Sequence, residues 1–219
     1  MFIEESLWIR QAIHDLPLPD RAKIADVGSS DLFFRTRVQP HIAQNIYFPM
    51  ERRGFLISSC DSKKDLGVDH QLDLCDQNRT PKEQIGQAFD LVLCANMLEH
   101  VEDRQLAIRS LLSLVKINGY LLITVPREYF YHEDPIDTMY RPTPREVVSL
   151  LEQQAACEVI TESILPITQK QYYIMPVYPT KLLHNLPFFA YRSAWRWLLK
   201  PFRWKVTCLL VRIGKKAQD

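Results

Sequence analysis

The sequence predicts an α/β fold in which a mostly parallel sheet carries helices on both faces. Short apolar runs alternate with amphipathic segments over the first 155 residues, an alternation typical of parallel sheets with crossover helices. The clearest strand is FDLVLCAN, residues 89–96, whose near-continuous apolar run indicates burial on both faces. A chain of 219 residues with 47% apolar content is long enough for one such domain with a full core.

Six further strands are predicted from short apolar runs bounded by turn residues. They occupy residues 23–28, 54–61, 67–76, 119–126, 157–165 and 204–214. The last strand follows a long insertion without a crossover helix of the usual kind. One domain over 1–219 is predicted, with an N-terminal helix 3–15, a core 20–167, a basic aromatic insertion 168–203 and the last strand 204–214.

Helices are predicted where apolar residues recur at helical spacing. The segment 3–15 ends before two prolines, and a short helix is expected up to Pro40. The segment 97–116 has a broad apolar face and is expected to end at Asn118-Gly119. The last helix, 143–154, begins with a capping box.

Composition and charge indicate the redox state of the cysteines, the cellular location and the kind of binding partner. The five cysteines are an odd number without a CxxC pair, which favours reduced thiols over disulfides or zinc. No signal peptide or membrane span is expected, so a cytoplasmic location is predicted. Residues 1–162 carry a net charge of −8, whereas 163–218 carry ten Lys and Arg and no acid. This asymmetry indicates an anionic partner for the C-terminal segment.

The predicted carboxyl ends of the strands are acidic. Ligands of open α/β sheets bind at these ends, where Asp26, Asp61 and Asp73 stand and no Lys or Arg does. Neither a GxGxxG nor a GxxxxGK[ST] phosphate loop occurs. An acidic edge suits a cofactor with a positive charge, ribose hydroxyls and an amine, which S-adenosylmethionine combines.

Four ordered motifs resemble the class I S-adenosylmethionine-dependent methyltransferases. They are Asp26-Val27-Gly28 with Arg35, FDLVLCANMLEHV at 89–101, VKINGYLLITVP at 115–126, and Arg141-Pro142-Thr143-Pro144. The resemblance spans about residues 20–155 and implies a Rossmann-like, seven-stranded methyltransferase sheet, mostly parallel with an antiparallel last strand, and S-adenosylmethionine as cofactor. Two glycines that are usual in the first motif are replaced here by Ser30 and Leu32. Asn118 stands where a glycine is common in the third motif, and asparagine can also adopt the left-handed conformation of that glycine.

The resemblance also implies the cofactor-binding residues, each of which has a turn or cap role as its alternative. Asp26 would lie near the methionine ammonium, Gly28 would let the backbone approach the cofactor, and Asp61 would accept both ribose hydroxyls. The remaining positions are Ser29 in the turn, Asp73 at the adenine amine, Leu74 on the adenine ring and Asn96 at the methionine end. Asp69 and Asp76 are competing alignments for Asp73.

Methyl transfer to a hydroxyl needs orientation and a base. Candidate catalytic residues are His132, His100 and Asp134, with Asp137 beside them. The polar segment 131–141 is expected to be a substrate loop over the site, with a solvated loop as the alternative. His132, Asp134 and Asp137 could instead hold a metal, but no fourth ligand is evident, and no metal is predicted.

The segment 188–205 places basic residues on one helical stripe and aromatic residues beside it. It is expected to pack as a lid, to contact a membrane surface peripherally, or to recognise a phosphate-bearing acceptor. Nucleic acid is ranked low because no binding motif accompanies the charges.

The predicted function is S-adenosylmethionine-dependent methylation, on oxygen, of a small-molecule, glycan or lipid-linked anionic acceptor. A non-catalytic scaffold of the same fold with a degenerate cofactor pocket is the alternative. A dinucleotide dehydrogenase is disfavoured because Asp61 stands 33 residues after Gly28, against about 20 in that fingerprint.

Overall fold

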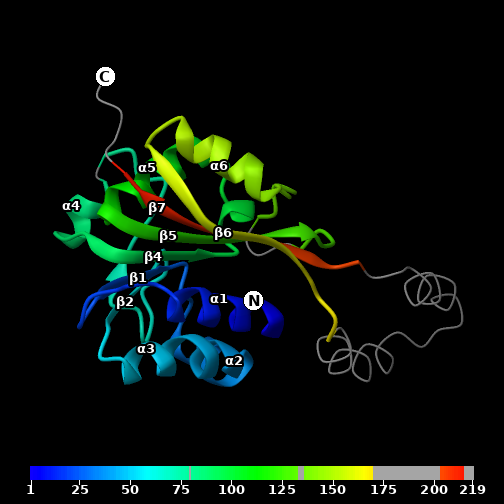
Figure 1. The fold of residues 1–219 in the computed structure, drawn as a ribbon, viewed down its shortest axis with the longest axis horizontal. Coiled ribbons are helices and arrows are strands. Elements are labelled where there is room, and N and C mark those ends of the chain that lie inside the picture. Colours follow the sequence, from blue (N-terminus) through cyan, green and yellow to red (C-terminus); the bar gives the residue numbers. More distant parts are fainter. Residues whose placement is uncertain (79, 133–135, 170–202, 215–219) are drawn as a thin grey trace, which may run out of the picture.

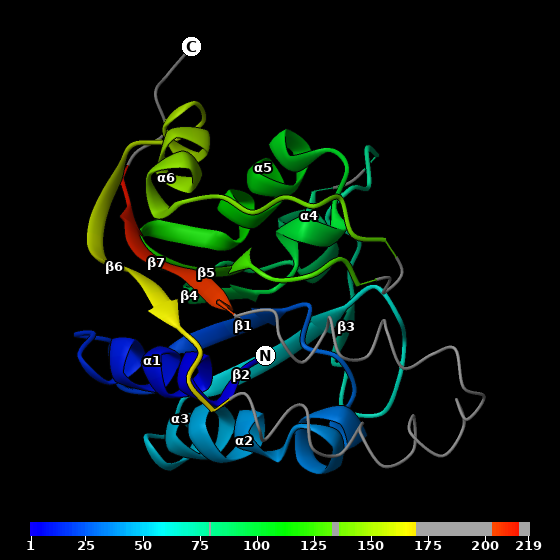
Figure 2. The ribbon, with the colours of Figure 1, turned by 90° about the vertical axis from the view of Figure 1, so that its right-hand side faces the viewer.

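A computed structural model describes residues 1–78, 80–132, 136–169 and 203–214. Helices cover both faces of a central sheet (Figures 1 and 2). On one face lie α1 (Ile3–His14), α2 (Pro40–Ile42) and α3 (Phe48–Arg52). On the other lie α4 (Pro81–Ile85), α5 (Arg104–Leu114) and α6 (Pro144–Glu152). No helix in the described ranges is long and apolar enough to cross a membrane.

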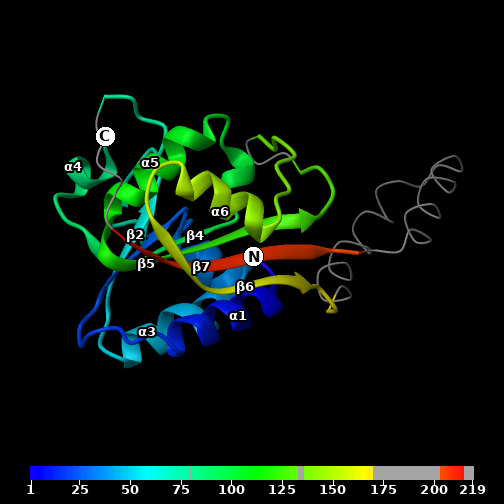
Figure 3. The ribbon, with the colours of Figure 1, turned by 45° about the horizontal axis from the view of Figure 1, so that its top comes forward.

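The described sheet has seven strands in the order β3-β2-β1-β4-β5-β7-β6. The strands are β1 (Lys23–Val27), β2 (Leu56–Asp61), β3 (His70–Gln71), β4 (Phe89–Ala95), β5 (Val115–Glu128), β6 (Cys157–Pro166) and β7 (Lys205–Ile213). The first five are parallel, and β7 is antiparallel to both β5 and β6, which lie beside it in Figure 3. The predicted fold class is confirmed. Strand order reverses between β1 and β4, which makes their carboxyl ends the expected ligand site.

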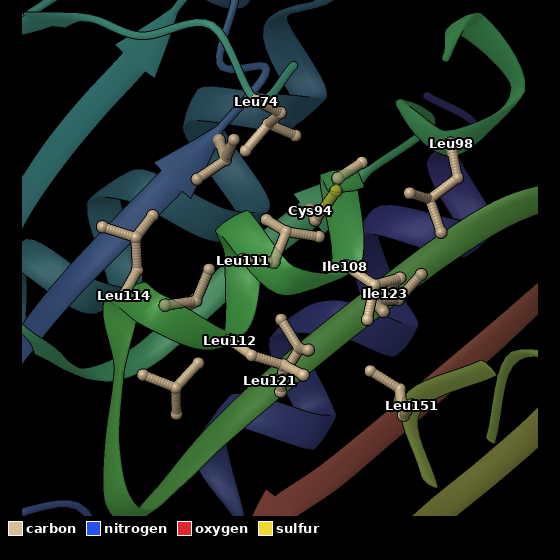
Figure 4. Packing of buried hydrophobic residues seen from close by; sticks show 14 of the residues in the cluster. Leu74, Cys94, Leu98, Ile108, Leu111, Leu112, Leu114, Leu121, Ile123 and Leu151 are labelled. Carbon is tan, nitrogen blue, oxygen red and sulfur yellow. The ribbon is translucent and has the colours of Figure 1, made fainter. Parts of the chain in front are cut away.

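Strand β4 shows why this sequence is buried on both faces. Val92 and Cys94 belong to the apolar cluster beneath α5, whereas Leu91 and Leu93 belong to the cluster beneath α1. Successive side chains of a strand point to opposite faces, so two helical layers require the unbroken apolar run. Figure 4 shows the α5 cluster, in which Ile108 and Leu111 pack toward Leu121 and Ile123 of β5.

The continuous helix predicted over 97–116 is wrong. A short 3-10 turn covers Leu98–His100, and α5 begins only after Asp103. The Asp103 carboxylate accepts a hydrogen bond from Leu106 N at 2.9 Å and so caps the helix. The helix ends at Leu114, before Asn118, which adopts the expected left-handed conformation with φ of 65°.

Three other predicted boundaries differ. The strand predicted over 119–126 is longer and runs over Val115–Glu128. The third strand shrinks from 67–76 to His70–Gln71, so the residues after it form turns. Helical structure extends beyond Pro40 to Arg52, through the π-helical turn Ala43–Tyr47 and α3. Prolines 40 and 49 stand in first turns, where a missing N–H costs nothing. The predicted insertion 168–203 lies almost wholly outside the described residues, so its lid and membrane roles stay predictions.

Asp90 of the FDLV motif joins the starts of three strands. Its carboxylate accepts hydrogen bonds from Lys23 N and from Lys116 Nζ, both at 2.8 Å. Burial alone would raise its pKa, but these partners lower it below the ordinary value. The motif aspartate therefore stabilises the sheet.

Replacing Asp90 with asparagine is expected to lower the free energy of unfolding by about 0.5–1 kcal/mol at neutral pH. Because the folded-state pKa is lowered, the stabilisation is present above the unfolded-state pKa and is lost as the pH falls through the folded-state value. Urea denaturation across this range should show wild type and variant converging in acid. The exposed Asp20→Asn is the control, and a difference that persists in acid would contradict the ion-pair explanation.

Thr143 caps α6 as predicted. Its hydroxyl accepts from Glu146 N at 3.3 Å, and the Glu146 carboxylate accepts from Thr143 N. Thr143→Ala is expected to cost about 1 kcal/mol of unfolding free energy. Urea denaturation would measure it against Ser149→Ala, an exposed position in the same helix. Equal stability of the two variants would exclude the capping contribution.

Candidate functional site

The turn after β1 bends sharply across the end of β2. Gly28 has φ of 79°, and its N–H and that of Ser29 both donate to Cys60 O, at 2.9 and 3.1 Å. Ser29 is buried and its hydroxyl donates to Ser30 O. A Cβ on Gly28 would lie 2.3 Å from Cγ and Sδ of Met97. The single glycine therefore stands where both the conformation and the packing require it.

Asp61, at the end of β2, is tied to this turn. One carboxylate oxygen accepts from Ser30 N at 2.9 Å and the other from Lys63 N at 3.1 Å. The residue is half-buried, so part of the carboxylate remains accessible. Each oxygen keeps a further lone pair, which a pair of hydroxyls can use.

Arg35 stabilises the turn after β1 through hydrogen bonds to backbone carbonyls. Its place in the first motif did not predict this role. Its buried guanidinium donates to Ser30 O at 3.0 Å and to Gly67 O at 2.7 Å. It also lies 4.7 Å from the centroid of the Tyr47 ring. Because these backbone carbonyls already occupy the Arg35 guanidinium, it is not available to bind a phosphate at the acidic edge.

Asp26 lies buried in the same layer. Its carboxylate accepts a hydrogen bond from the Tyr47 hydroxyl at 2.5 Å. Burial raises the pKa of Asp26, although Tyr47 and Arg35 oppose the shift. One carboxylate oxygen of Asp26 is therefore hydrogen-bonded inside the protein, to Tyr47. The contact of Asp26 with the methionine ammonium stays a prediction.

Of the two residues predicted to contact the adenine, Asp73 is exposed to solvent and Leu74 is buried. Asp73 is exposed, and its carboxylate accepts from Cys75 N at 2.8 Å. The Leu74 side chain is 4% exposed and packs in the α5 cluster, as Figure 4 shows. Leu74 therefore offers a ligand little besides its backbone, because its side chain belongs to the core.

Asn96, just beyond β4, is held by the N-terminal helix. It has φ of 53°, and its side-chain amide donates to Glu5 Oε1 at 2.8 Å. Glu5 is fully buried and also accepts from the Thr124 hydroxyl at 2.5 Å. Sequence reasoning did not single out Glu5. Its only signal is that it shares a helical face with the buried Ile9 and Ile13.

A second polar group follows Asn96 directly. Glu99, His100 and His132 each present one ligand atom, and these atoms lie within 4.8 Å of one another. We call these three residues the Glu–His–His cluster. Asp137 borders it, with Oδ2 at 3.1 Å from His132 Nδ1. The predicted candidate Asp134 lies outside the described residues.

Burial sets the protonation of this cluster. It raises the pKa of Glu99 to about 8 and lowers the pKa of His132 below its ordinary value. Burial would also raise the pKa of Asp137, but its ion pair with Arg141, at 2.6 Å, helps to hold that pKa at about 2. Near neutral pH the cluster therefore contains a neutral His132 beside an ionised Asp137.

The described residues fit S-adenosylmethionine in their donor set. The edge offers a partly accessible carboxylate at Asp61, an exposed one at Asp73 and a tight glycine turn at Gly28. The arginine at this edge is already paired with carbonyls. A cavity of about 570 Å³ lies elsewhere, between α1 and α3, and contains none of the predicted site residues.

Comparisons with known proteins bear on the family and the fold of the chain. A family model described as a methyltransferase domain matches residues 19–162. No curated protein matches the chain in sequence. Among solved structures, the cyclase SpnF is 15% identical, with a TM-score of 0.58 over 95% of this chain and 81% of its own.

Two further solved structures have methyltransferase names. Coclaurine N-methyltransferase, bound to N-methylheliamine and SAH, is 11% identical, with a TM-score of 0.58 over 94% of this chain and 72% of its own. A putative sarcosine dimethylglycine methyltransferase from Galdieria sulphuraria is 13% identical, with a TM-score of 0.58 over 98% and 85%. At these identities the structures show a shared fold, and the family match carries the assignment. The chain belongs to the class I S-adenosylmethionine-dependent methyltransferase family, as its four motifs predict.

Proposed function

We propose that this methyltransferase transfers a methyl group to a hydroxyl oxygen of a small-molecule or glycan-type acceptor. When bound, S-adenosylmethionine supplies a methyl group activated on a positively charged sulfur. Asp61 would hold the ribose, Asp73 and the Leu74 backbone the adenine, and Gly28 and Asn96 the methionine end. The protein then has to orient the acceptor and remove its proton.

The proximity of the Glu–His–His cluster to Asn96 carries the proposal for oxygen. Glu99 follows Asn96 by three residues, and Glu5, which binds Asn96, contributes to the raised pKa of Glu99. The two imidazole rings lie 5.1 Å apart. A neutral imidazole in reach of an acceptor hydroxyl is a suitable proton acceptor. Asp137 holds His132 in place, since it also accepts from His132 N at 3.1 Å.

We further propose that the acceptor is anionic. The support is the charge of residues 163–218, which contain ten Lys and Arg and no acid. A phosphate or carboxylate on a glycan or lipid-linked acceptor would be attracted to such a segment. The N-methyltransferase name of one structural neighbour makes an amine the competing acceptor.

Mass spectrometry tests both parts. The full chain is incubated with methyl-labelled cofactor and fractionated extract, and the labelled product is fragmented to locate the methyl group. An O-methyl group on an anionic product is expected. An N-methyl product would overturn the oxygen assignment, and a neutral product would overturn the charge assignment. Absence of cofactor turnover in every fraction would favour a non-catalytic role.

A further inference from the structure

We propose that the Glu–His–His cluster binds a divalent first-row transition-metal ion of the Zn²⁺ type. The three residues come from two separate segments, because Glu99 and His100 follow β4 and His132 follows β5. The topology brings them together at the carboxyl edge of the sheet. A metal site therefore forms from residues whose spacing in the sequence resembles no zinc motif.

Glu99 is the strongest evidence. Its side chain is completely buried, and neither carboxylate oxygen has a hydrogen-bond partner among the described residues. Buried carboxylates are normally paired or hydrogen-bonded. The nearest cationic candidate is the imidazole of His100, whose Nε2 stands 3.7 Å from Glu99 Oε1, beyond hydrogen-bond length. A metal ion would satisfy both oxygens.

The two histidines are arranged as ligands. His100 Nδ1 lies 2.5 Å from Ile136 O, and since a carbonyl can only accept, this nitrogen carries the proton. His100 Nε2 is then left with its lone pair on the side of Glu99. A carbonyl that fixes the other ring nitrogen in this way is the usual second partner of a metal-bound histidine. Nδ1 of His132 lies 3.1 Å from Asp137 Oδ2, and a carboxylate in this position is the other usual second partner of a metal-bound histidine.

The donor set selects the class of metal. Two imidazoles and one carboxylate occur in zinc enzymes that keep an open coordination position, and in other first-row sites, whereas Mg²⁺ and Ca²⁺ prefer oxygen alone. Bonds of about 2.1 Å in a tetrahedral site would bring the ligand atoms to about 3.4 Å apart. Rotation of the His132 side chain, which is partly exposed on its loop, can supply this contraction.

The ion deepens the proposed function, and this step rests on that function. An acceptor hydroxyl in the open position becomes more acidic on the metal. The O–H bond would break and its proton would leave to solvent. The electron pair left on oxygen would form the O–CH3 bond as the S–CH3 bond of the cofactor breaks, with that bond's electron pair staying on sulfur to give S-adenosylhomocysteine. His100 and His132 then act as ligands, and no imidazole has to take up the proton.

Binding is tested without cofactor or acceptor. The full chain is freed of metal with a chelator and titrated calorimetrically with ZnCl₂. One equivalent is expected to bind, and Glu99→Gln and His132→Asn are each expected to weaken binding at least tenfold. The exposed Glu102→Gln and His14→Asn are matched controls that should bind like wild type. With Co²⁺ as the probe, visible absorption should show nitrogen and oxygen ligation without a thiolate band, which excludes the cysteines.

Thermal unfolding separates binding from folding. Metal-free Glu99→Gln is expected to melt no lower than wild type, because it removes an unpaired buried carboxylate, yet to lose the rise in melting temperature that Zn²⁺ induces. Should Glu99→Gln fail to fold, the loop variant His132→Asn decides alone. No binding of Zn²⁺ or Co²⁺, or equal binding by all variants, overturns the proposal. Metal binding by a protein that transfers no methyl group would overturn the proposed function but leave the site intact.

Discussion

Replacing Gly28 with alanine is expected to abolish measurable cofactor binding and to lower the free energy of unfolding by about 2–5 kcal/mol. Part of this cost is the left-handed backbone, since φ is 79°. The rest is steric, because the new methyl group would lie 2.3 Å from two atoms of Met97. Met97, which follows Asn96 at the predicted methionine end of the cofactor, would have to move. Calorimetric titration with S-adenosylmethionine and urea denaturation measure the two effects.

Gly54→Ala is the matched control for Gly28→Ala. Gly54 has nearly the same φ, 76°, but nothing lies within 4 Å of an added Cβ. It should therefore cost only the backbone strain, about 1–2 kcal/mol, and leave cofactor affinity unchanged. If the two variants are equally destabilised, the contact with Met97 does not contribute to the cost of Gly28→Ala. If Gly28→Ala retains full affinity, the cofactor does not approach this turn.

Asp61→Asn is expected to weaken cofactor binding by roughly 10–100-fold. The carboxylate already accepts from Ser30 N and Lys63 N, and its remaining lone pairs are the ones available to a ribose diol. An amide cannot replace it, because its nitrogen has no lone pair to offer. The measurement is again calorimetric titration with S-adenosylmethionine.

The control for Asp61→Asn is Asp65→Asn, four residues further along the same loop and exposed. It should bind the cofactor like wild type. Unchanged affinity in Asp61→Asn would place the ribose elsewhere. Asp69, the alternative to Asp73 at the adenine amine, accepts a hydrogen bond from Ser59 N at 2.8 Å and so already has a structural role.

Local patterns were sufficient for the fold class. The run FDLVLCAN, the capping box at Thr143 and the left-handed Asn118 each depend on interactions within a few residues or on burial on both faces. The error at 97–116 has the same origin. Apolar periodicity continues through Leu98 and Val101, but the Asp103 cap begins the helix later, and the preceding turn carries Glu99 to the sheet edge.

The sequence by itself determined the sheet, its acidic carboxyl edge and the family, because strand periodicity and strand-end residues are local properties of the chain. Only the tertiary structure decided which polar groups share an environment. It placed Glu5 of the first helix against Asn96, committed Arg35 to backbone carbonyls, and brought His132 to Glu99 and His100. These contacts join residues from 5 to 91 positions apart. They also depend on burial, which sets hydrogen bonding and protonation and which spacing in the sequence does not reveal.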